Sequence, residues 1–580
     1  MSKKSFFVVS SSYKESFNIE EPILFLGSWC EPKKEFSFDK EFEILTSLPL
    51  KKTQKDEMFN EARNFQAKIS KILFGVLNRH HKKKFTDREW KILIGHWVRR
   101  ATETLLNRVN LVNTSINSYN LIGTHEIVNY DLSTTDSLSF IHATNDDKWN
   151  LAINAAIFRS YVKDERFFNK INSDILKVEI KYPKHSKVKV FISKILSFFT
   201  KKNDRFFIGE YFSSFLLQLS YFQIPQFPIT PVIKKRGGTN YEIRNKLSKE
   251  FLREVDRLKL ENSYKIICSL IFDIIPQNYL EDLKLIDQLS KNLNWPKEPK
   301  YIFTSNDFDT NDVFKYWLIT KMRKGSQYFV GQHGNNYKTH KYLAFDTIEE
   351  QTSDKFVTWG WKGKGKNYEK GFIFNSIKTK THKKNTKQIL LILRTLERRE
   401  VIWDSYDEYL KYFESICIFL NYLKKNTIKN FLVRLHKDNK TLNVIDDEKR
   451  KLMSIHNKIN IDDGVSDIGY LFNTSALIIH GYDSTGVLQT LSKNLPTLIF
   501  CSNGIDYLND SSIKYYQLLI DAGILYTTPQ SLAKKIERVS GDVDEWWASK
   551  DIQIARKEFC SQYANTSSNH VVDLKKILGT

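Results

Sequence analysis

A histidine between two glycines, His333 in the run GQHGNN, is the side chain of this sequence best placed for chemistry. The apolar run that ends at Val330 predicts a β-strand, so Gly331 and Gly334 flank the histidine in a turn at the strand's carboxyl end. Glycines let a backbone approach a ligand closely, and an imidazole changes its charge near neutral pH. A lone histidine is usually a core residue, but this turn offers no helix to bury it. We therefore predict that His333 acts on a ligand, and that Gln332 completes the turn.

Three basic side chains end apolar runs in the C-terminal third of the chain. Arg434 and His436 end VRLH and lie on the same side, because alternate residues of a strand share a face. Arg394 ends LLILR at the equivalent point of another run. Fixed cations beside a titratable donor suit a diphosphate or phosphodiester. Each alone could be a solvated surface charge, but three at the strand ends of one sheet favour an anion site.

The stretch HGYDSTGVLQTLSKNLPTLIF is the most informative in the sequence. It predicts a strand that ends at His480, a turn that carries Asp483, Ser484 and Thr485, and a helix that opens at Gly486. The start of a helix has unpaired N–H groups and the positive end of the helix dipole, so with two hydroxyls it would bind a phosphate. The alternative is that one hydroxyl only caps the helix. The two roles are compatible.

Other motifs do not indicate chemistry. The run from Asp462 to Gly464 reads as an ordinary polar turn between strands. Gly363 to Lys366 lacks the strand and helix that a phosphate-binding loop requires, and HExxH and GxSxG motifs are absent. Five cysteines lie dozens of residues apart, without CxxC spacing. We therefore expect a reducing compartment, no disulfide framework, no metal site and no cofactor.

Apolar runs that alternate with helical patterns predict an α/β fold with parallel sheets. We expect strands at 23–27, 301–306, 327–330 and 355–361, and an N-terminal helical insertion with helices at 56–79 and 87–108. Thr86 and Glu89 have the capping-box spacing at the start of the second helix. Further strands are expected at 388–394, 430–436, 476–480 and 496–500. A lysine-rich stretch between about Gly371 and Gln388 predicts a linker, so we expect two doubly wound domains that face each other across a cleft.

Composition limits the classes of function. The chain has 580 residues, of which 41% are hydrophobic and 13% aromatic, so it can bury a large core and is not disordered. Its net charge of +22 favours an anionic partner: nucleic acid, anionic lipid or phosphorylated small molecules. A non-enzymatic binder of RNA or of an anionic polymer is the alternative of another class. Such a binder would cluster its basic and aromatic residues, whereas the lysines here are spread throughout, so we expect no nucleic-acid partner.

One segment has the pattern of an interfacial amphipathic helix. In KVKVFISKILSFFTKK, from Lys187 to Lys202, apolar residues lie between lysines at both ends. Contact with an anionic membrane is one interpretation. We favour a helix that faces the core, because buried amphipathic helices are far commoner. No signal-type segment and no apolar run of spanning length occurs, so we expect neither export by a signal nor a membrane span.

The order of these motifs resembles a known group of enzymes. A strand followed by QHG, then R-x-H at a strand end, then D-S-T-G-x-L-x-x-L-x-x-x-x-P-T is similar to the GT-B glycosyltransferases that use cytidine nucleotides: bacterial sialyltransferases, Kdo transferases and CDP-glycerol polymerases. In those families a histidine of an RxHP-like motif and a Ser-Ser or Ser-Thr pair hold the donor phosphate, which matches His436, Ser484 and Thr485. His333 matches the histidine of the HG turn, a base or acceptor contact.

A narrower group resembles nearly the whole chain: putative transferases of O-antigen and capsule loci, some similar to pseudaminyltransferases. The runs FLGSWC, LNRHH, WKILIGHW, IIPQNYLEDL, GSQYFVGQHG and DEWWASKDIQIARKEF carry this resemblance. Two positions depart from the wider GT-B pattern. Lys437 replaces the proline of the HP motif, and Gln489 stands where many GT-B enzymes place a ribose-binding glutamate.

The resemblance implies a metal-independent transfer of a sugar, with CMP or another nucleotide as leaving group, onto a glycan or lipid-linked glycan of the cell surface. A CMP-activated nonulosonic or ulosonic acid is the expected donor, and a CDP-polyol or NDP-sugar is the alternative. The phosphate would be held by Arg394, Arg434, His436, the segment from Asp483 to Gly486, and Gln489. His333 is the first choice for the acid or base. Carboxylate candidates are Asp131, Asp136 and Asp147. Of these, Asp147 is predicted to be catalytic, although it could equally cap a helix.

The same resemblance implies a domain plan. We expect an N-terminal Rossmann-like domain over 1–375 on the acceptor side and a C-terminal Rossmann-like domain over 386–545 on the nucleotide side. Helices over 546–580 would pack back on the first domain, a role given to Asp551 to Ala564. The enzyme is expected in the cytoplasm, with the inner face of the plasma membrane as a peripheral location.

Overall fold

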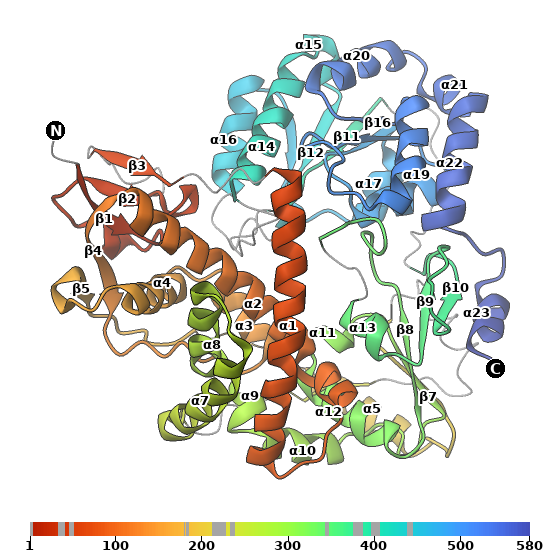
Figure 1. The fold of residues 1–580 in the computed structure, drawn as a ribbon. Helices are drawn as coiled ribbons and strands as arrows, with labels where there is room; N and C mark the ends of the chain where they lie inside the picture. The colour runs from red at the N-terminus through yellow and green to blue at the C-terminus, as the bar shows by residue number, and fades with distance from the viewer. Residues whose placement is uncertain are drawn as a thin grey trace.

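The computed structural model describes residues 4–32, 41–45, 51–178, 180, 182, 185–210, 228–231, 238–342, 347–374, 387–395, 406–437 and 445–579. Within these ranges the strands form three sheets, and every strand pairing in them is parallel (Figure 1). Helices pack between and around the sheets. The α/β class with several Rossmann-like sheets is therefore confirmed.

The first sheet has the strand order β3-β2-β1-β4-β5, which is the order of a Rossmann sheet. Its strands are β1 (Ser5–Val9), β2 (Ile23–Phe25), β3 (Phe42–Ile44), β4 (Asn120–Ile127) and β5 (Phe168–Ile171). The expectation that the chain's first strand starts at Ile23 is wrong. The run FFVV, directly behind the basic N-terminal tip, forms the central strand β1, whose last four residues are buried between β2 and β4.

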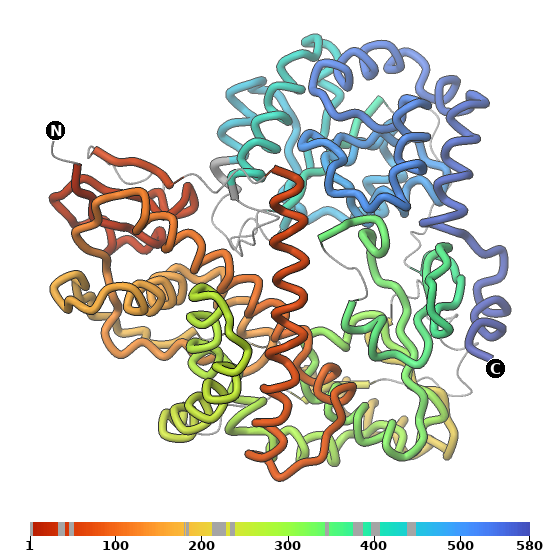
Figure 2. The backbone as a smooth tube through the Cα atoms, in the orientation of Figure 1, coloured from red at the N-terminus to blue at the C-terminus, as the bar shows by residue number. Residues whose placement is uncertain are grey.

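The expected N-terminal helices are confirmed. They are α1 (Lys52–His81) and α2 (Asp87–Ser118), the long helices that cross the molecule in Figures 1 and 2. The capping box at the start of α2 is also confirmed, because Glu89 N donates to Thr86 Oγ1 at 3.3 Å and Thr86 N donates to Glu89 Oε2 at 2.7 Å. Two further helices, α3 (Ser137–Ala143) and α4 (Asp147–Tyr161), follow β4.

The second sheet has the order β10-β9-β8-β7-β6. Its strands are β6 (Arg205–Ile208), β7 (Tyr301–Thr304), β8 (Gln327–Gly331), β9 (Lys355–Thr358) and β10 (Tyr368–Lys370). The expected strands at β7, β8 and β9 are confirmed, and β6 adds an edge strand. The helices around them are α7 (Tyr241–Val255), α8 (Asn262–Ile274), α9 (Gln277–Leu280), α10 (Leu283–Lys291), α11 (Asp307–Thr310), α12 (Asp312–Met322) and α13 (Ile348–Thr352).

The third sheet has the order β13-β12-β11-β14-β15-β16, again a Rossmann order. Its strands are β11 (Ile389–Ile392), β12 (Phe431–Arg434), β13 (Asn460–Asp462), β14 (Leu477–His480), β15 (Thr497–Phe500) and β16 (Leu525–Tyr526), so all four expected strands are confirmed. The helices are α14 (Tyr406–Asn421), α15 (Lys425–Ile428), α16 (Ile445–Ile455), α17 (Ile468–Thr474), α18 (Thr485–Ser492), α19 (Asp510–Asp521) and α20 (Pro529–Val539).

The C-terminal segment returns from the third sheet to the second. It forms α21 (Val543–Ala548), α22 (Lys550–Tyr563) and α23 (His570–Leu578), and in Figure 2 the blue end of the chain runs down beside β9 and β10. Between α22 and α23, Asn565 N donates to Trp359 O and Ile373 N donates to Asn565 O, each at 2.8 Å. The proposed linker lies mostly outside the described residues, since 375–386 are not among them, and the three domain boundaries stay a prediction.

The helix α5 (Lys187–Ser197) corrects one expectation. We favoured a helix that faces the core, but Ser193 is the only buried residue of α5. Phe191 is 63% exposed, and Phe198, just beyond the helix, is 77% exposed. The physical reason is that the apolar side of this helix is turned away from the part of the chain that the structure describes.

Candidate active site at the contact of two strand-end turns

The carboxyl ends of three neighbouring strands bring the predicted phosphate-binding residues to one edge of the third sheet. Ile392 at the end of β11 is in register with both Arg434 of β12 and His480 of β14. Arg394 and the turn after His480 therefore leave the sheet at the same edge. Strand order reverses between β11 and β14, and such a reversal is where open α/β sheets bind ligands.

The turn after β14 is built on a buried histidine. His480 is fully buried, and burial lowers its pKa to about 3, so the ring is neutral. Its Nδ1 lies 3.3 Å from Ser484 Oγ and its Nε2 lies 3.1 Å from Thr490 Oγ1. Gly486 packs on the same ring, where a Cβ would come within 2.7 Å of His480 Cε1. Ser484 occupies the N-cap position of α18 without a side-chain capping bond, so its hydroxyl is used by His480 instead.

Asn335 joins this turn to the glycine turn after β8. Its backbone N donates to Thr485 Oγ1 at 3.1 Å, and its Nδ2 donates to Asp483 Oδ1 at 2.6 Å. The other oxygen of Asp483 accepts from Tyr516 at 2.6 Å and from Tyr507 at 3.1 Å. Burial raises the pKa of Asp483, and these hydrogen bonds oppose the rise. The structure therefore brings the two predicted turns together, and it uses Asp483 and Thr485 to connect them.

His333 is the first member of a hydrogen-bonded chain. Its Nδ1 lies 2.8 Å from the Tyr337 hydroxyl, which donates its proton to Glu349 Oε1 at 2.5 Å. A tyrosine has a single O–H, so Nδ1 of His333 must donate to Tyr337, and Nε2 keeps the lone pair. Burial lowers the pKa of His333, which favours the neutral ring. Burial raises the pKa of Glu349, partly opposed by the Tyr337 hydrogen bond.

Gln332 fixes the backbone on the other side of His333. Its Oε1 accepts from Trp359 N and from Trp361 Nε1, both at 2.9 Å, and its Nε2 donates to Gly334 O at 2.8 Å. Gly331 is also required by packing, since a Cβ there would lie 2.6 Å from the Phe303 ring. The turn that carries His333 is thus held rigidly by its neighbours.

A second layer of charged side chains lies behind this chain. His96 of α2 places Nε2 3.5 Å from Glu349 Oε2 and Nδ1 3.7 Å from Asp309 Oδ1. Burial lowers the pKa of His96 well below its usual value. Burial opposes ionisation of Asp309, but Arg100, 2.6 Å away, and His96 outweigh it and hold the pKa of Asp309 far below its usual range.

Three polar atoms of this layer lack a hydrogen bond within the described part of the chain: His96 Nε2, Asp309 Oδ1 and Glu349 Oε2. Buried polar atoms are nearly always paired, with protein, water or ligand. These polar atoms face one another in a packed, buried group close to His333, whose ring lies 5.6 Å from that of Phe308 in the same helix as Asp309.

The remaining predicted cations are partly engaged. Arg434 is ion-paired with Asp462, and its Nη1 donates to Ser466 O at 2.9 Å, so it anchors the polar turn after β13. The guanidinium of Arg394 lies 5.5 Å from the ring centres of Tyr409 and Tyr412. His436 is half-buried just beyond β12, and Gln489 lies in the second turn of α18. Their contact with a donor stays a prediction.

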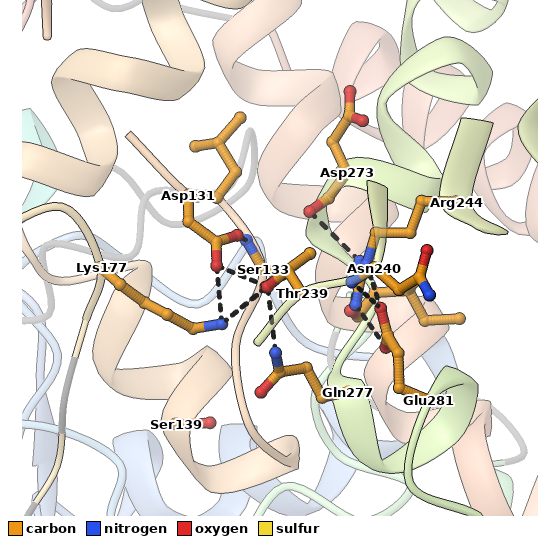
Figure 3. A network of polar contacts seen from close by, with 12 residues as sticks. Asp131, Ser133, Ser139, Lys177, Thr239, Asn240, Arg244, Asp273, Gln277 and Glu281 are labelled. Carbon is orange, nitrogen blue, oxygen red and sulfur yellow. Dashed lines mark hydrogen bonds and ion pairs between the residues drawn. The ribbon is translucent and has the colours of Figure 1, made fainter. Parts of the chain in front are cut away.

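The three carboxylates proposed from the sequence have other surroundings. Asp131 lies in the polar network of Figure 3, where its Oδ2 accepts from Lys177 at 2.9 Å and Thr239 at 2.5 Å. Burial opposes these bonds, but they hold the pKa of Asp131 below its usual value. Asp136 caps α3, and burial together with Asp312 raises its pKa. Asp147 is the first residue of α4, whose cap is its neighbour Asp146. None of the three contacts His333.

Sequence reasoning missed Asn335, Tyr337, Glu349, His96 and Asp309. A signal existed for His96, because WKILIGHW places a single imidazole in an otherwise apolar helical run. Glu349 gave no signal of its own, because it precedes Glu350, which forms the capping box of α13 with Thr347. Helix capping is therefore a sufficient local reason for acidic residues at these two positions. The contact of these residues with His333 depends on packing between α2, α11 and α13, which no local pattern contains.

The described ranges contain neither a metal-binding cluster nor a membrane-spanning helix. No cluster of three or more His, Cys, Asp and Glu side chains there has the geometry to hold a metal ion. None of the helices there combines the length and the apolar character needed to cross a membrane.

Comparison with known proteins identifies the family. The model of the LIC12162 family transferases matches residues 6–578. The chain belongs to this family. It is therefore a transferase, as expected. No curated protein matches the sequence.

Similar solved structures include MnaA of S. aureus with UDP, at 11% identity and a TM-score of 0.32, covering 78% of this chain and 94% of that one. An α,α-trehalose-phosphate synthase (UDP-forming) from Burkholderia vietnamiensis has 8% identity and a TM-score of 0.32, covering 62% and 95%. The spinosyn rhamnosyltransferase SpnG, solved with spinosyn aglycone, has 11% identity and a TM-score of 0.26, covering 52% and 78%.

Proposed function

We propose that this transferase is a GT-B-like glycosyltransferase that moves a sugar, a CMP-activated nonulosonic or ulosonic acid, from its nucleotide onto a surface glycan at the cytoplasmic side of the membrane. The observation that carries the proposal is the contact between the His333 turn and the start of α18. Through Asn335, the turn that carries His333 contacts a helix start at the order-reversal point of a Rossmann sheet, where open α/β sheets bind ligands.

The donor phosphate belongs at the start of α18. The first N–H groups of a helix have no partner within the helix, and its dipole favours an anion there. Ser484, Arg394 and His436 border the same sheet edge. When the bond between the anomeric carbon and the phosphate oxygen breaks, negative charge grows on the leaving nucleotide. Preorganised donors and cations at this edge would stabilise that charge.

The acceptor hydroxyl belongs on the side of His333. As its oxygen forms the new bond to the anomeric carbon, its proton passes to Nε2 of His333. Tyr337 and Glu349 hold the ring in the tautomer that leaves Nε2 free to accept this proton.

Nucleotide release tests the proposal. The purified chain is incubated with a panel of CMP-, CDP- and UDP-linked sugars, with and without glycan acceptors, and free nucleotide is measured. We expect CMP release from a CMP-linked acidic sugar, which the variant His333→Asn abolishes. The matched control is His456→Asn, in the loop before β13.

Other outcomes would assign a different donor to the enzyme or a different class of function to the protein. Release of UDP from a UDP-linked sugar alone would assign an NDP-sugar donor to the same site, and release of CMP from an added CDP-polyol alone would assign the transfer of a polyol phosphate. Binding of single-stranded RNA with no release from any nucleotide sugar would reject the enzyme and favour the basic-binder alternative.

A further inference from the structure

The helix α5 presents its apolar side to solvent. Seven apolar residues of α5 and the turn after it are exposed by 41% to 77% of their surface. Val190 lies on the side of Ser193, and the other six are Val188, Phe191, Ile192, Ile195, Phe198 and Phe199. At about 100° per residue they fall within one sector of about 120°. Ser193, the buried residue of α5, lies on the opposite side. An ordinary surface helix buries such a stripe, so the orientation of α5 is the reverse of the usual one.

Lysines border this apolar stripe. Lys187, Lys189 and Lys194 lie in α5 and Lys201 follows it, and all four are exposed. The segment from Lys187 to Asn203 contains no acidic residue. An apolar face with aromatic residues and a lysine border fits the boundary between lipid headgroups and acyl chains of an anionic bilayer.

The helix is formed before any partner binds. Ser186 caps it, since its Oγ accepts from Lys189 N at 3.2 Å. In Figure 1, α5 lies at the end of the molecule opposite the third sheet. Contact at α5 therefore leaves the third-sheet unit away from the surface that is covered.

We propose that α5 is a membrane-docking surface that inserts its apolar side into an anionic lipid bilayer. This proposal does not rest on the proposed glycosyl transfer, because it uses only the exposure and charge of α5. The occupant is the lipid surface, and a second copy of the chain is an outcome that the test separates from it.

Vesicle sedimentation tests the proposal. The full-length chain is mixed with vesicles of equal parts phosphatidylcholine and phosphatidylglycerol, or of phosphatidylcholine alone. We expect it to sediment with the anionic vesicles and to stay largely in solution with the neutral ones. Phe191→Ser with Phe198→Ser should abolish binding. Lys187→Gln combined with Lys189→Gln and Lys194→Gln should lower the partition ratio about 100-fold.

A matched control removes exposed apolar residues elsewhere. Ile554 and Val572 are exposed by 55% and 57%, so Ile554→Ser with Val572→Ser should bind as the unchanged chain does. Melting curves show whether each variant is folded. Absence of binding to anionic vesicles, or full binding by the folded Phe191→Ser, Phe198→Ser variant, would overturn the proposal. The proposal would also be overturned if the unchanged chain formed a concentration-dependent dimer and this variant alone were monomeric, because a second copy of the chain would then cover α5.

Discussion

Tyr337 determines which nitrogen of His333 carries a proton. Because the Tyr337 hydroxyl donates to Glu349, it accepts from Nδ1 of His333, and Nε2 is left as the base. A histidine in a glycine turn would otherwise sample both tautomers. The glycine turn thus supplies access, and the residues behind it supply the protonation state.

The first prediction concerns His333 itself. The change to asparagine keeps a polar side chain but removes proton transfer, so kcat should fall by ~10²–10⁴ with nucleotide affinity unchanged. In the unchanged enzyme the neutral ring is active, and burial lowers its pKa. Activity should therefore persist at neutral pH and decline only as the pH falls through that lowered pKa. Steady-state kinetics across pH and nucleotide titration measure both effects. Weakened nucleotide affinity with nearly normal turnover at saturating donor would assign His333 to donor binding instead.

The second prediction tests whether Glu349 acts through the hydrogen bond that its carboxylate accepts from Tyr337 or only through its size and position. In Glu349→Gln the new amide can donate to Tyr337, whose O–H then turns toward Nδ1 and moves the histidine proton to Nε2. We expect a fall in kcat near that of His333→Asn, because the base is lost without loss of the ring. Tyr337→Phe should lower kcat less, because phenylalanine has no O–H that could donate to Nδ1 of His333 and move the ring proton to Nε2. Equal activity of Glu349→Gln and the unchanged enzyme would show that the hydrogen-bonded chain has no role in turnover.

At the scale of the element, the start of α18 is the test of phosphate binding. The hydroxyl of Ser484 makes no capping bond, so Ser484→Ala should weaken donor binding by ~1.5–3 kcal/mol per charge-assisted bond lost, with a small change in melting temperature. Thr485→Ala, as a single change or combined with Ser484→Ala, also removes the hydrogen bond that Asn335 N donates to Thr485 Oγ1. Calorimetric titration with CMP and melting curves distinguish the roles. If the double variant binds CMP normally but has a lower melting temperature, Ser484 and Thr485 have only a structural role.

The edge of β12 and β13 gives a contrasting prediction. Arg434 is committed to Asp462 and to carbonyls of the following turn. Arg434→Met leaves a nearly buried carboxylate without its cation, so the free energy of unfolding should fall by ~1.5–3 kcal/mol. Chemical denaturation measures this loss. If Arg434→Met leaves the free energy of unfolding unchanged but weakens nucleotide binding, Arg434 would instead be a donor-binding residue.

At the scale of the whole molecule, the sequence predicted the strands that carry site motifs, because YFV, LLI and LIIH are continuous apolar runs bounded by turn residues. In the first sheet it predicted only β2 and missed β1, which follows a basic tip, as well as β3, β4 and β5. It also missed β6, which has an arginine and three apolar residues within a polar stretch. The His333 and Ser484 turns could each be predicted from local pattern. Their contact through Asn335, and the layer of His96 and Glu349 behind them, arise from packing between distant segments.

A nucleotide phosphate that binds at the start of α18 and faces His333 is the core of the proposed function. A crystal structure of the chain with CMP would locate that phosphate. We predict the phosphate within hydrogen-bonding distance of the Ser484 hydroxyl and the backbone N–H groups of Thr485 and Gly486, with the His333 turn opposite. The first sheet also reverses its strand order, between β1 and β4. A nucleotide bound at that reversal instead, away from α18, would contradict the account.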